Sequence, residues 1–309
     1  MKLIKPKAEL LLQQPGLEGV YKQIELAGRT CYKSTDKITE DSAKPFVDRM
    51  INSKHTAMLE HGTIYLAIPI TTNHAGFSEN HYRNNPYSKF KESYGLCMKD
   101  EYGDKCDCWC ITTNLRVLVE NGWLDDLQYI CEPTEYHERR YTFRVITSIG
   151  VTREFNRHRV NSIAEQSTRY CNYSKYKFGN EVTFCLPSWL SSTEYTAMTP
   201  EERIFFRSCE HAEFDYLRLI SKGWQPQQAR EVLPLCTATE AVYTAFTSDW
   251  KHFFDLRYFG KTGAPHPNML ELSSLMAKEV AATASLMVEE ADKHNIWSEL
   301  CNEQINGNT

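Results

Sequence analysis

The spacing of apolar side chains predicts several helices. Apolar residues recur at three- and four-residue intervals over residues 41–52 and 200–222, which is the period of one helical face. Thr199, Pro200 and Glu202 form a capping signal for the second of these helices, and Asp41 is expected to cap the first. Residues 17–31 are helix-like or mixed. Further helices are expected over residues 114–120, 227–233, 243–257 and 268–297.

Strand-like segments alternate with these helices. Residues 63–70 are rich in β-branched and aromatic side chains, and residues 141–148 alternate between Tyr141, Phe143 and Val145 and their neighbours, a two-residue period typical of strands. Residues 182–186 form another short candidate. The combination predicts an α+β fold in which helices pack on a mostly antiparallel sheet.

Residues 71–140 differ from the rest, because Asn-Pro, glycines and cysteines interrupt them repeatedly. We interpret this region as a large insertion or subdomain in one domain that spans residues 1–309. Four of the eleven cysteines of the chain lie within it, at Cys97, Cys106, Cys108 and Cys110. Their spacing lacks the paired Cys-x-x-Cys of common zinc modules, so reduced thiols are favoured over a bound metal.

Composition narrows the class of protein. The chain has 309 residues, 41% of them hydrophobic, and a net charge of −5. A mildly acidic protein is not expected to bind nucleic acid through a general basic surface. No apolar run reaches the roughly 18 residues of a membrane span, and the first residues lack a secretion signal. A cytoplasmic protein with a local anion site is the resulting expectation.

Residues 157–170 concentrate the candidate chemistry. They begin with Arg157, His158 and Arg159 and end with Ser167-Thr168-Arg169-Tyr170. Clustered guanidinium groups are costly to bury without anionic partners, so the segment is either a solvated turn or a cradle for anions. Glu165 and Arg169 are four apart and could instead form a helical ion pair. The pattern alone leaves these alternatives open.

The order of the motifs narrows the choice. Arg157-His158-Arg159 is followed after seven residues by Ser167, and this arrangement resembles the signature of the flavin-dependent thymidylate synthases. Other segments resemble the same family in the same order: Arg29-Thr30-Cys31-Tyr32, residues 55–61 with their Leu-Glu-His ending, Ala229-Arg230 with Leu233-Pro234, and Trp250, His252, Phe253 and Arg257. Ordered matches over most of the chain are more specific than one short motif. Residues 71–140 lie outside the resemblance.

The resemblance implies a reaction and an assembly. Enzymes of this family convert dUMP to dTMP by reductive methylation, with methylenetetrahydrofolate as the carbon donor, FAD as the cofactor and NADPH as the reductant. They are homotetramers with a fold of their own, and their active sites form at subunit interfaces. The lack of a Gly-x-Gly-x-x-Gly motif in this chain agrees with a fold that is not a Rossmann domain.

The resemblance also implies roles for single residues. Arg257 would be the catalytic residue, because a fixed guanidinium beside the uracil ring favours loss of the imide proton. The residues implied to bind dUMP are Glu154, Arg157, Glu165, Gln166, Ser167, Thr168, Arg169, Arg230 and Arg257. Those implied to bind FAD are Ala57, Arg157, His158, Arg159, Glu165, His252 and His266. No metal and no enzyme thiol is required.

The sequence departs from the family at some positions, and two other classes of protein remain. Asn156 replaces a usual apolar residue, Cys31 replaces a small hydroxyl residue, and about five extra residues separate Arg257 from His266. One alternative is a thiol-dependent methyltransferase with Cys236 as nucleophile. The other is a non-catalytic nucleotide- or zinc-binding protein built around residues 71–140.

Overall fold

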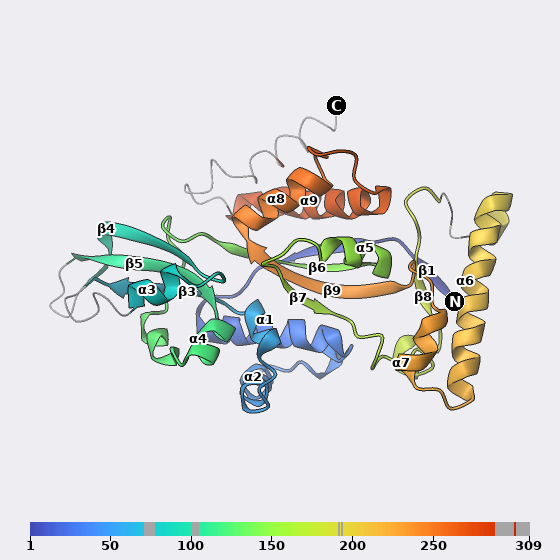
Figure 1. The fold of residues 1–309 in the computed structure, drawn as a ribbon, viewed down its shortest axis with the longest axis horizontal. Helices are drawn as coiled ribbons and strands as arrows, with labels where there is room; N and C mark the ends of the chain where they lie inside the picture. The colour runs from blue at the N-terminus through green and yellow to red at the C-terminus, as the bar shows by residue number, and fades with distance from the viewer. Residues whose placement is uncertain (71–77, 100–104, 191, 193, 288–299, 301–309) are drawn as a thin grey trace.

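The structure is a computed structural model that describes residues 1–70, 78–99, 105–190, 192, 194–287 and 300. An antiparallel four-stranded sheet lies at its centre, in the order β2-β6-β9-β7. A three-stranded sheet extends from one end of it, and helix α6 stands across the other end (Figure 1). The predicted α+β class with mostly antiparallel strands is confirmed.

Two long strands form the middle of the central sheet. Strands β6 (Arg140–Ser148) and β9 (Ala238–Phe246) pair antiparallel over their whole length, and every residue of β9 is buried. The outer strands are β2 (Lys7–Leu11) and β7 (Ser162–Glu165). A central strand covered on both faces explains why β9 carries few exposed polar positions.

Helices cover the two faces of this sheet. On one face, Phe143 and Tyr243 pack with Trp250 in a core that includes residues of α5 (Ile149–Phe155), α8 (Thr247–Arg257) and α9 (Pro267–Met287). On the other face, Ala27 of α1 (Gly16–Cys31) packs against Val242. Arg157 follows α5 and Arg257 ends α8, so both residues lie at the ends of helices that cover this first face.

The region interpreted as an insertion shares its core with the segments before it. Strand β5 (Lys105–Asn114) pairs with both β3 (Thr63–Pro69) and β4 (Lys89–Lys99). A single apolar cluster joins this sheet to α1, α2 (Ala43–Asn52) and α4 (Leu115–Asn121). The remaining helices of this part are α3 (Ser78–Arg83), η1 (Thr35–Lys37), η2 (Thr56–His61) and η3 (Leu124–Tyr129). The division into one domain with an insertion stays a prediction.

A third core lies beside α6 (Pro200–Ser221). Tyr173, Phe184 and Tyr216 pack there, next to the parallel pair of β1 (Lys2–Ile4) and β8 (Thr183–Cys185). The capping box is present, since Thr199 accepts from the Glu202 amide and Glu202 accepts from the Thr199 amide. The nearby short helices are α7 (Pro226–Ala229), η4 (Tyr176–Phe178), η5 (Tyr195–Ala197) and η6 (Arg230–Val232).

Two sequence predictions were wrong in detail, and a third is only partly tested. Residues 243–246 belong to β9 rather than to the helix, because tertiary burial between β6 and β7 favours a strand; α8 begins at Thr247. Asp41 does not cap α2. The N-cap residue of α2 is Ser42, and its side chain makes no capping hydrogen bond. The predicted helix over residues 268–297 is described only as far as Met287, and its remainder lies outside the described residues.

Candidate functional site

The Arg-His-Arg motif lies in the turn that joins α5 to β7. Helix α5 starts at a cap in which the Ser148 hydroxyl accepts from the Val151 amide. The motif residues follow the helix, and Val160 then adopts a left-handed φ of 65°. A β-branched residue with this φ is strained. The strained turn presents Arg157 and Arg159 to solvent, without a side-chain partner among the described residues.

Arg257, at the end of α8, contacts the end of α5. Its Nη1 lies 3.1 Å from Glu154 Oε2, and its Nε donates to His158 Nε2 at 3.0 Å. The Ser273 hydroxyl of α9 donates to the carbonyl of Arg257 at 2.8 Å. Two side chains that lie about one hundred positions away in sequence thus orient the guanidinium, which the motif order alone did not reveal.

His158 is held as a neutral imidazole. Burial, the Arg257 guanidinium and His252 lower the pKa of His158 to about 4. The Nε2 atom that accepts from Arg257 must be unprotonated, which agrees with this direction. The His252 ring centroid lies 5.8 Å away. At neutral pH the motif therefore contributes two positive charges rather than three.

A small cleft opens beside these groups. Its lining includes His158, Arg159, Asn161, Asp249 and His252. The Asn161 Oδ1 and Asp249 Oδ2 atoms are buried and make no hydrogen bond with the described residues, and burial raises the pKa of Asp249. Buried polar atoms without partners are uncommon in folded proteins, so this cleft is suited to a polar ligand.

A second group of cationic side chains surrounds the segment after β7. Arg230 Nη1 donates to Thr168 Oγ1 at 3.0 Å, and Arg169 Nε donates to Gln227 Oε1 at 3.0 Å. Both guanidinium groups are exposed. The Ser167 amide donates to the carbonyl of Cys31 at 2.9 Å, which ties the segment to the end of α1. The hydrogen-bond partners are neutral, and the ion pair of Arg230 with exposed Glu231, at 3.5 Å, is open to solvent, so both arginines can bind an anion.

Glu165 lies on β7, at the strand end that precedes this second group. Its Oε1 accepts from the Thr152 hydroxyl at 2.8 Å. The alternative of a helical ion pair between Glu165 and Arg169 is wrong, because Glu165 ends a strand and Arg169 bonds to a glutamine. Gln166 is buried, and its amide donates to the carbonyl of Glu240 at 2.7 Å.

Two residues expected at the flavin lie apart from these contacts. Ala57 is exposed on η2. His266 precedes α9, where its Nδ1 accepts from the Asn268 amide at 3.2 Å and its ring lies 6.0 Å from Trp189. In one chain, no described hydrogen bond joins either residue to the contacts around Arg257. Their assignment to FAD stays a prediction.

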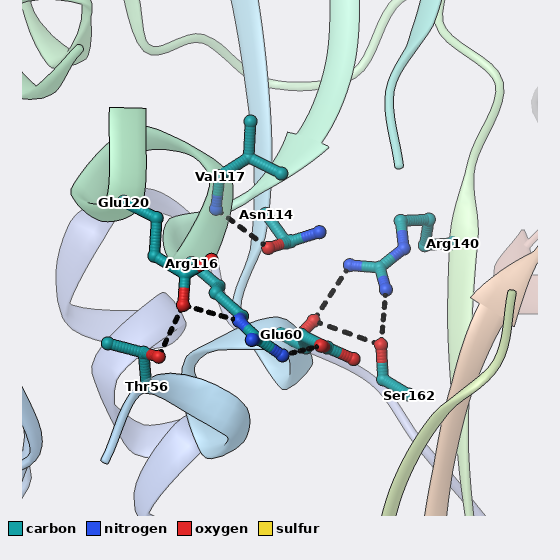
Figure 2. A network of polar contacts seen from close by, with 8 residues as sticks. All are labelled: Thr56, Glu60, Asn114, Arg116, Val117, Glu120, Arg140 and Ser162. Carbon is teal, nitrogen blue, oxygen red and sulfur yellow. Dashed lines mark hydrogen bonds and ion pairs between the residues drawn. The ribbon is translucent and has the colours of Figure 1, made fainter. Parts of the chain in front are cut away.

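The sequence reasoning missed a buried arginine that supports β7. Figure 2 shows Arg140 donating to the carbonyl of Glu60 at 3.0 Å and to the Ser162 hydroxyl at 2.9 Å. Arg116 and Glu120 extend the network on the other side of Glu60. Arg140 links η2 to the first residue of β7. An arginine at the start of a strand gives no signal in sequence that it is buried.

The cysteines supply no metal site that the structure describes. Within the described part of the chain, no three His, Cys, Asp or Glu side chains are placed to hold a metal ion. The Cys97 side chain lies outside that part. Cys236, the candidate thiol nucleophile, has its sulfur 3.7 Å from that of Cys209 in the core beside α6.

Comparisons with known proteins relate part of this chain to one family. Residues 133–285 match the family model described as thymidylate synthase complementing protein, Thy1. These residues hold both arginine groups. The match covers just under half of the chain, and this part resembles that family.

Two curated relatives are named flavin-dependent thymidylate synthase. One, from Geobacter sulfurreducens, is 28% identical over 138 residues, which cover 44% of this chain and 55% of the relative. The other, from Thermosipho melanesiensis, is 27% identical over 136 residues, which cover 40% of this chain and 56% of the relative. The chain thus spans little more than half the length of the curated relatives it matches.

Among solved structures, a UMP/dUMP methylase, PolB, from Streptomyces cacaoi bound with 5-Br dUMP aligns over 91% of this chain and 93% of its own. The TM-score is 0.42 at 18% identity, a likeness too low to bear on the fold or the ligand. No helix in the described ranges is long and apolar enough to cross a membrane.

Proposed function

We propose that this chain is an FAD-dependent thymidylate synthase. It would convert dUMP to dTMP by reductive methylation, with methylenetetrahydrofolate as the carbon donor and NADPH as the reductant. The observation that carries the proposal is the contact of Arg257 with Glu154 and His158. This contact joins two separate family motifs in one site.

The second arginine group suits the phosphate of dUMP. Arg169 and Arg230 are exposed, and each donates a hydrogen bond to a neutral side chain. Arg230 also forms an ion pair with exposed Glu231 at 3.5 Å. Guanidinium forks bind phosphate oxygens in pairs, and the Thr168 hydroxyl lies beside them. Glu154, Glu165, Gln166 and Ser167 complete the proposed dUMP-binding set together with Arg157 and Arg257.

The group formed by Arg157, His158 and Arg159 suits a flavin. The charges of Arg157 and Arg159 are not neutralised by described side chains, and the cleft beside them holds the unpaired Asn161 oxygen. Bound FAD would supply the reducing equivalents for methylation. Arg157, His158, Arg159 and His252 would hold it, and nearby positive charge would stabilise its reduced anionic form.

Arg257 is proposed to act on the substrate directly. A guanidinium does not lose its proton in proteins, so it can stay charged beside a uracil ring and favour the anionic imide. That charge makes the ring carbon more nucleophilic without attack by an enzyme thiol. Glu154 and neutral His158 fix the direction of the guanidinium, which reduces reorganisation during the reaction.

The proposal is tested first by colour. Purified protein should be yellow, and NADPH should bleach the flavin faster when dUMP is present. dTMP should form only when methylenetetrahydrofolate is added. Protein that stays colourless after incubation with FAD would exclude the flavin reaction.

The role of Arg257 is tested by substitution. Arg257→Ala should lower dTMP formation by about a hundredfold, because one electrostatic contact to a transition state contributes about 3 kcal/mol. Flavin content and melting temperature should stay near those of the parent protein. Arg207→Ala, on the exposed surface of α6, is the control and should keep full activity. Undiminished turnover in Arg257→Ala would remove the proposed role.

The thiol-dependent alternative requires Cys236. Its sulfur is only 3.7 Å from the buried Cys209, within an apolar core, which is a poor position for attack on a nucleotide. We expect Cys236→Ala to retain dTMP formation when assayed with NADPH and FAD. Complete loss of activity in a correctly folded Cys236→Ala protein would favour the thiol mechanism instead.

A further inference from the structure

A separate polar hollow lies on the α1 face of the central sheet. Ile146 and Glu240, which line it, alternate along their strands with residues of the core under α8 and α9. The hollow therefore opens on the opposite face of the sheet from that core. Its cavity volume is about 390 Å³, within the usual range for small-molecule sites.

Lysines from four segments surround this hollow. Lys2 lies on β1, Lys7 on β2, Lys33 just after α1, and Lys177 on η4. Lys2 and Lys7 are close in sequence, but Lys33 and Lys177 are distant from them and from each other, so the fold brings the set together. In a protein with a net charge of −5, this gathering is a local positive patch with a concave centre.

Nearby acidic groups do not neutralise all four lysines. Glu240 lines the hollow but already binds Arg144, whose Nε lies 2.6 Å away; Lys33 lies 3.6 Å from its other oxygen. Glu181 is paired with the amino group of Met1 at 3.3 Å. Lys2 and Lys7 form no ion pair with the described residues, and Lys177 donates to the Tyr32 carbonyl at 3.3 Å.

The lining also includes a buried donor without a partner. Tyr173 lines the hollow and is 4% exposed, and its hydroxyl makes no hydrogen bond with the described residues. The Gln166 side chain lies near this hydroxyl, and burial raises the pKa of Tyr173 more than Gln166 lowers it, so the phenol stays protonated and can donate. A buried hydroxyl without an acceptor is unfavourable, and a ligand oxygen would accept its hydrogen bond.

We propose that this hollow binds a phosphate-bearing anion, at a site separate from those of Arg257 and Arg169. Lysine ammonium groups act as flexible point charges and suit several oxygens of a polyphosphate, whereas carboxylates favour arginine forks. The Tyr173 hydroxyl would donate to one of those oxygens. Gln166 lines the hollow and also belongs to the proposed dUMP-binding set, so the two sites adjoin, but none of the four lysines belongs to that set.

The test uses the whole protein and inorganic tripolyphosphate, titrated by calorimetry at low salt. With saturating FAD and dUMP present to occupy the proposed methylation site, the parent protein should bind it at one further site per chain, and the double variant of Arg169→Ala with Arg230→Ala should keep this binding. Lys7→Gln combined with Lys177→Gln should weaken it at least tenfold. Tyr173→Phe should weaken it several-fold, and added salt should weaken it further.

Lys44→Gln combined with Lys222→Gln is the matched control, since both lysines are exposed elsewhere, and it should bind like the parent. Equal affinity in the Lys7 and Lys177 double variant, or equal loss in the control, would overturn the site. So would loss of binding in the Arg169 and Arg230 double variant. A nucleoside triphosphate titrated in parallel identifies the source: tighter binding supports a nucleotide, and equal binding supports bare polyphosphate.

Discussion

Single buried residues carry much of the information that connects this chain to its chemistry. Arg140 and His61 interact electrostatically although they are far apart in sequence. The positive guanidinium of Arg140 disfavours a positive charge on the His61 imidazole. Arg140 bridges η2 and β7 and forms no ion pair with a carboxylate of the described residues, and burial lowers the pKa of Arg140 to about 10. The two residues form a polar support beneath the segment that ends at Glu165.

His61 makes folding depend on pH. It is fully buried, and burial together with Arg140 lowers its pKa to about 3, while its Nδ1 lies 2.9 Å from Thr244 Oγ1. The unfolded imidazole takes up a proton below about pH 6.5 and the folded one does not. Stability from this residue is thus complete above pH 6.5 and declines as the pH falls towards 3.

Urea unfolding at pH 7 and pH 5 checks this effect. The parent protein should lose about 2 kcal/mol from His61 over this interval, since each pKa unit corresponds to about 1.4 kcal/mol. His61→Asn should be less stable at both values but should show a smaller difference between them. His55→Asn, at an exposed position, should keep the parent difference. An unchanged pH dependence in His61→Asn would contradict the buried neutral imidazole.

At the scale of elements, local signals predicted helix ends well. The predicted Thr199-Pro200 start of α6 appears in the structure, and Asn114, the first residue of the helix predicted over 114–120, caps α4. Gly122 then ends α4 with a left-handed φ of 73°. Capping signals involve residues within four positions of one another, so they do not depend on the tertiary fold. Residues at the end of strand β9 were predicted to be helical. They form a strand because β9 pairs with β6 on one side and β7 on the other, which its own residues do not reveal.

The cap of α6 supports a prediction at this scale. Thr199→Ala should lower the free energy of unfolding by about 1 kcal/mol, because it leaves the Glu202 amide without its acceptor. Chemical denaturation measures the change. Thr196→Ala, three residues earlier and exposed, is the matched control and should change stability little. A similar loss in both variants would show that the cap is not the cause.

At the scale of the whole molecule, two arginine groups lie in separate clusters of one chain. Arg257 contacts Glu154 and His158, whereas Arg169 and Arg230 contact Gln227 and Thr168. No described hydrogen bond or ion pair connects the clusters. The proposed homotetramer would allow one chain to complete the site of another, and both the assembly and the shared site stay predictions.

Mixing of inactive variants tests this arrangement. Arg257→Ala and Arg169→Ala should each be nearly inactive alone. If their residues act from different chains, unfolding and refolding them together should restore part of the parent activity, because some mixed sites receive both intact groups. Light scattering should show the same oligomer for all samples. Failure of the mixed oligomer to regain any turnover would place both arginines of each site in one chain.

The sequence by itself determined the family motifs, the ends of the capped helices and the α+β class, because these depend on neighbouring residues and on short periods. The tertiary structure decided which motifs meet. Glu154 reaches Arg257 across 103 positions, and lysines from distant segments surround one hollow. Contacts of this kind follow from strand order and packing, which no local pattern encodes. The neutral state of His158 was decided in the same way, since it results from burial and from a guanidinium supplied by another helix.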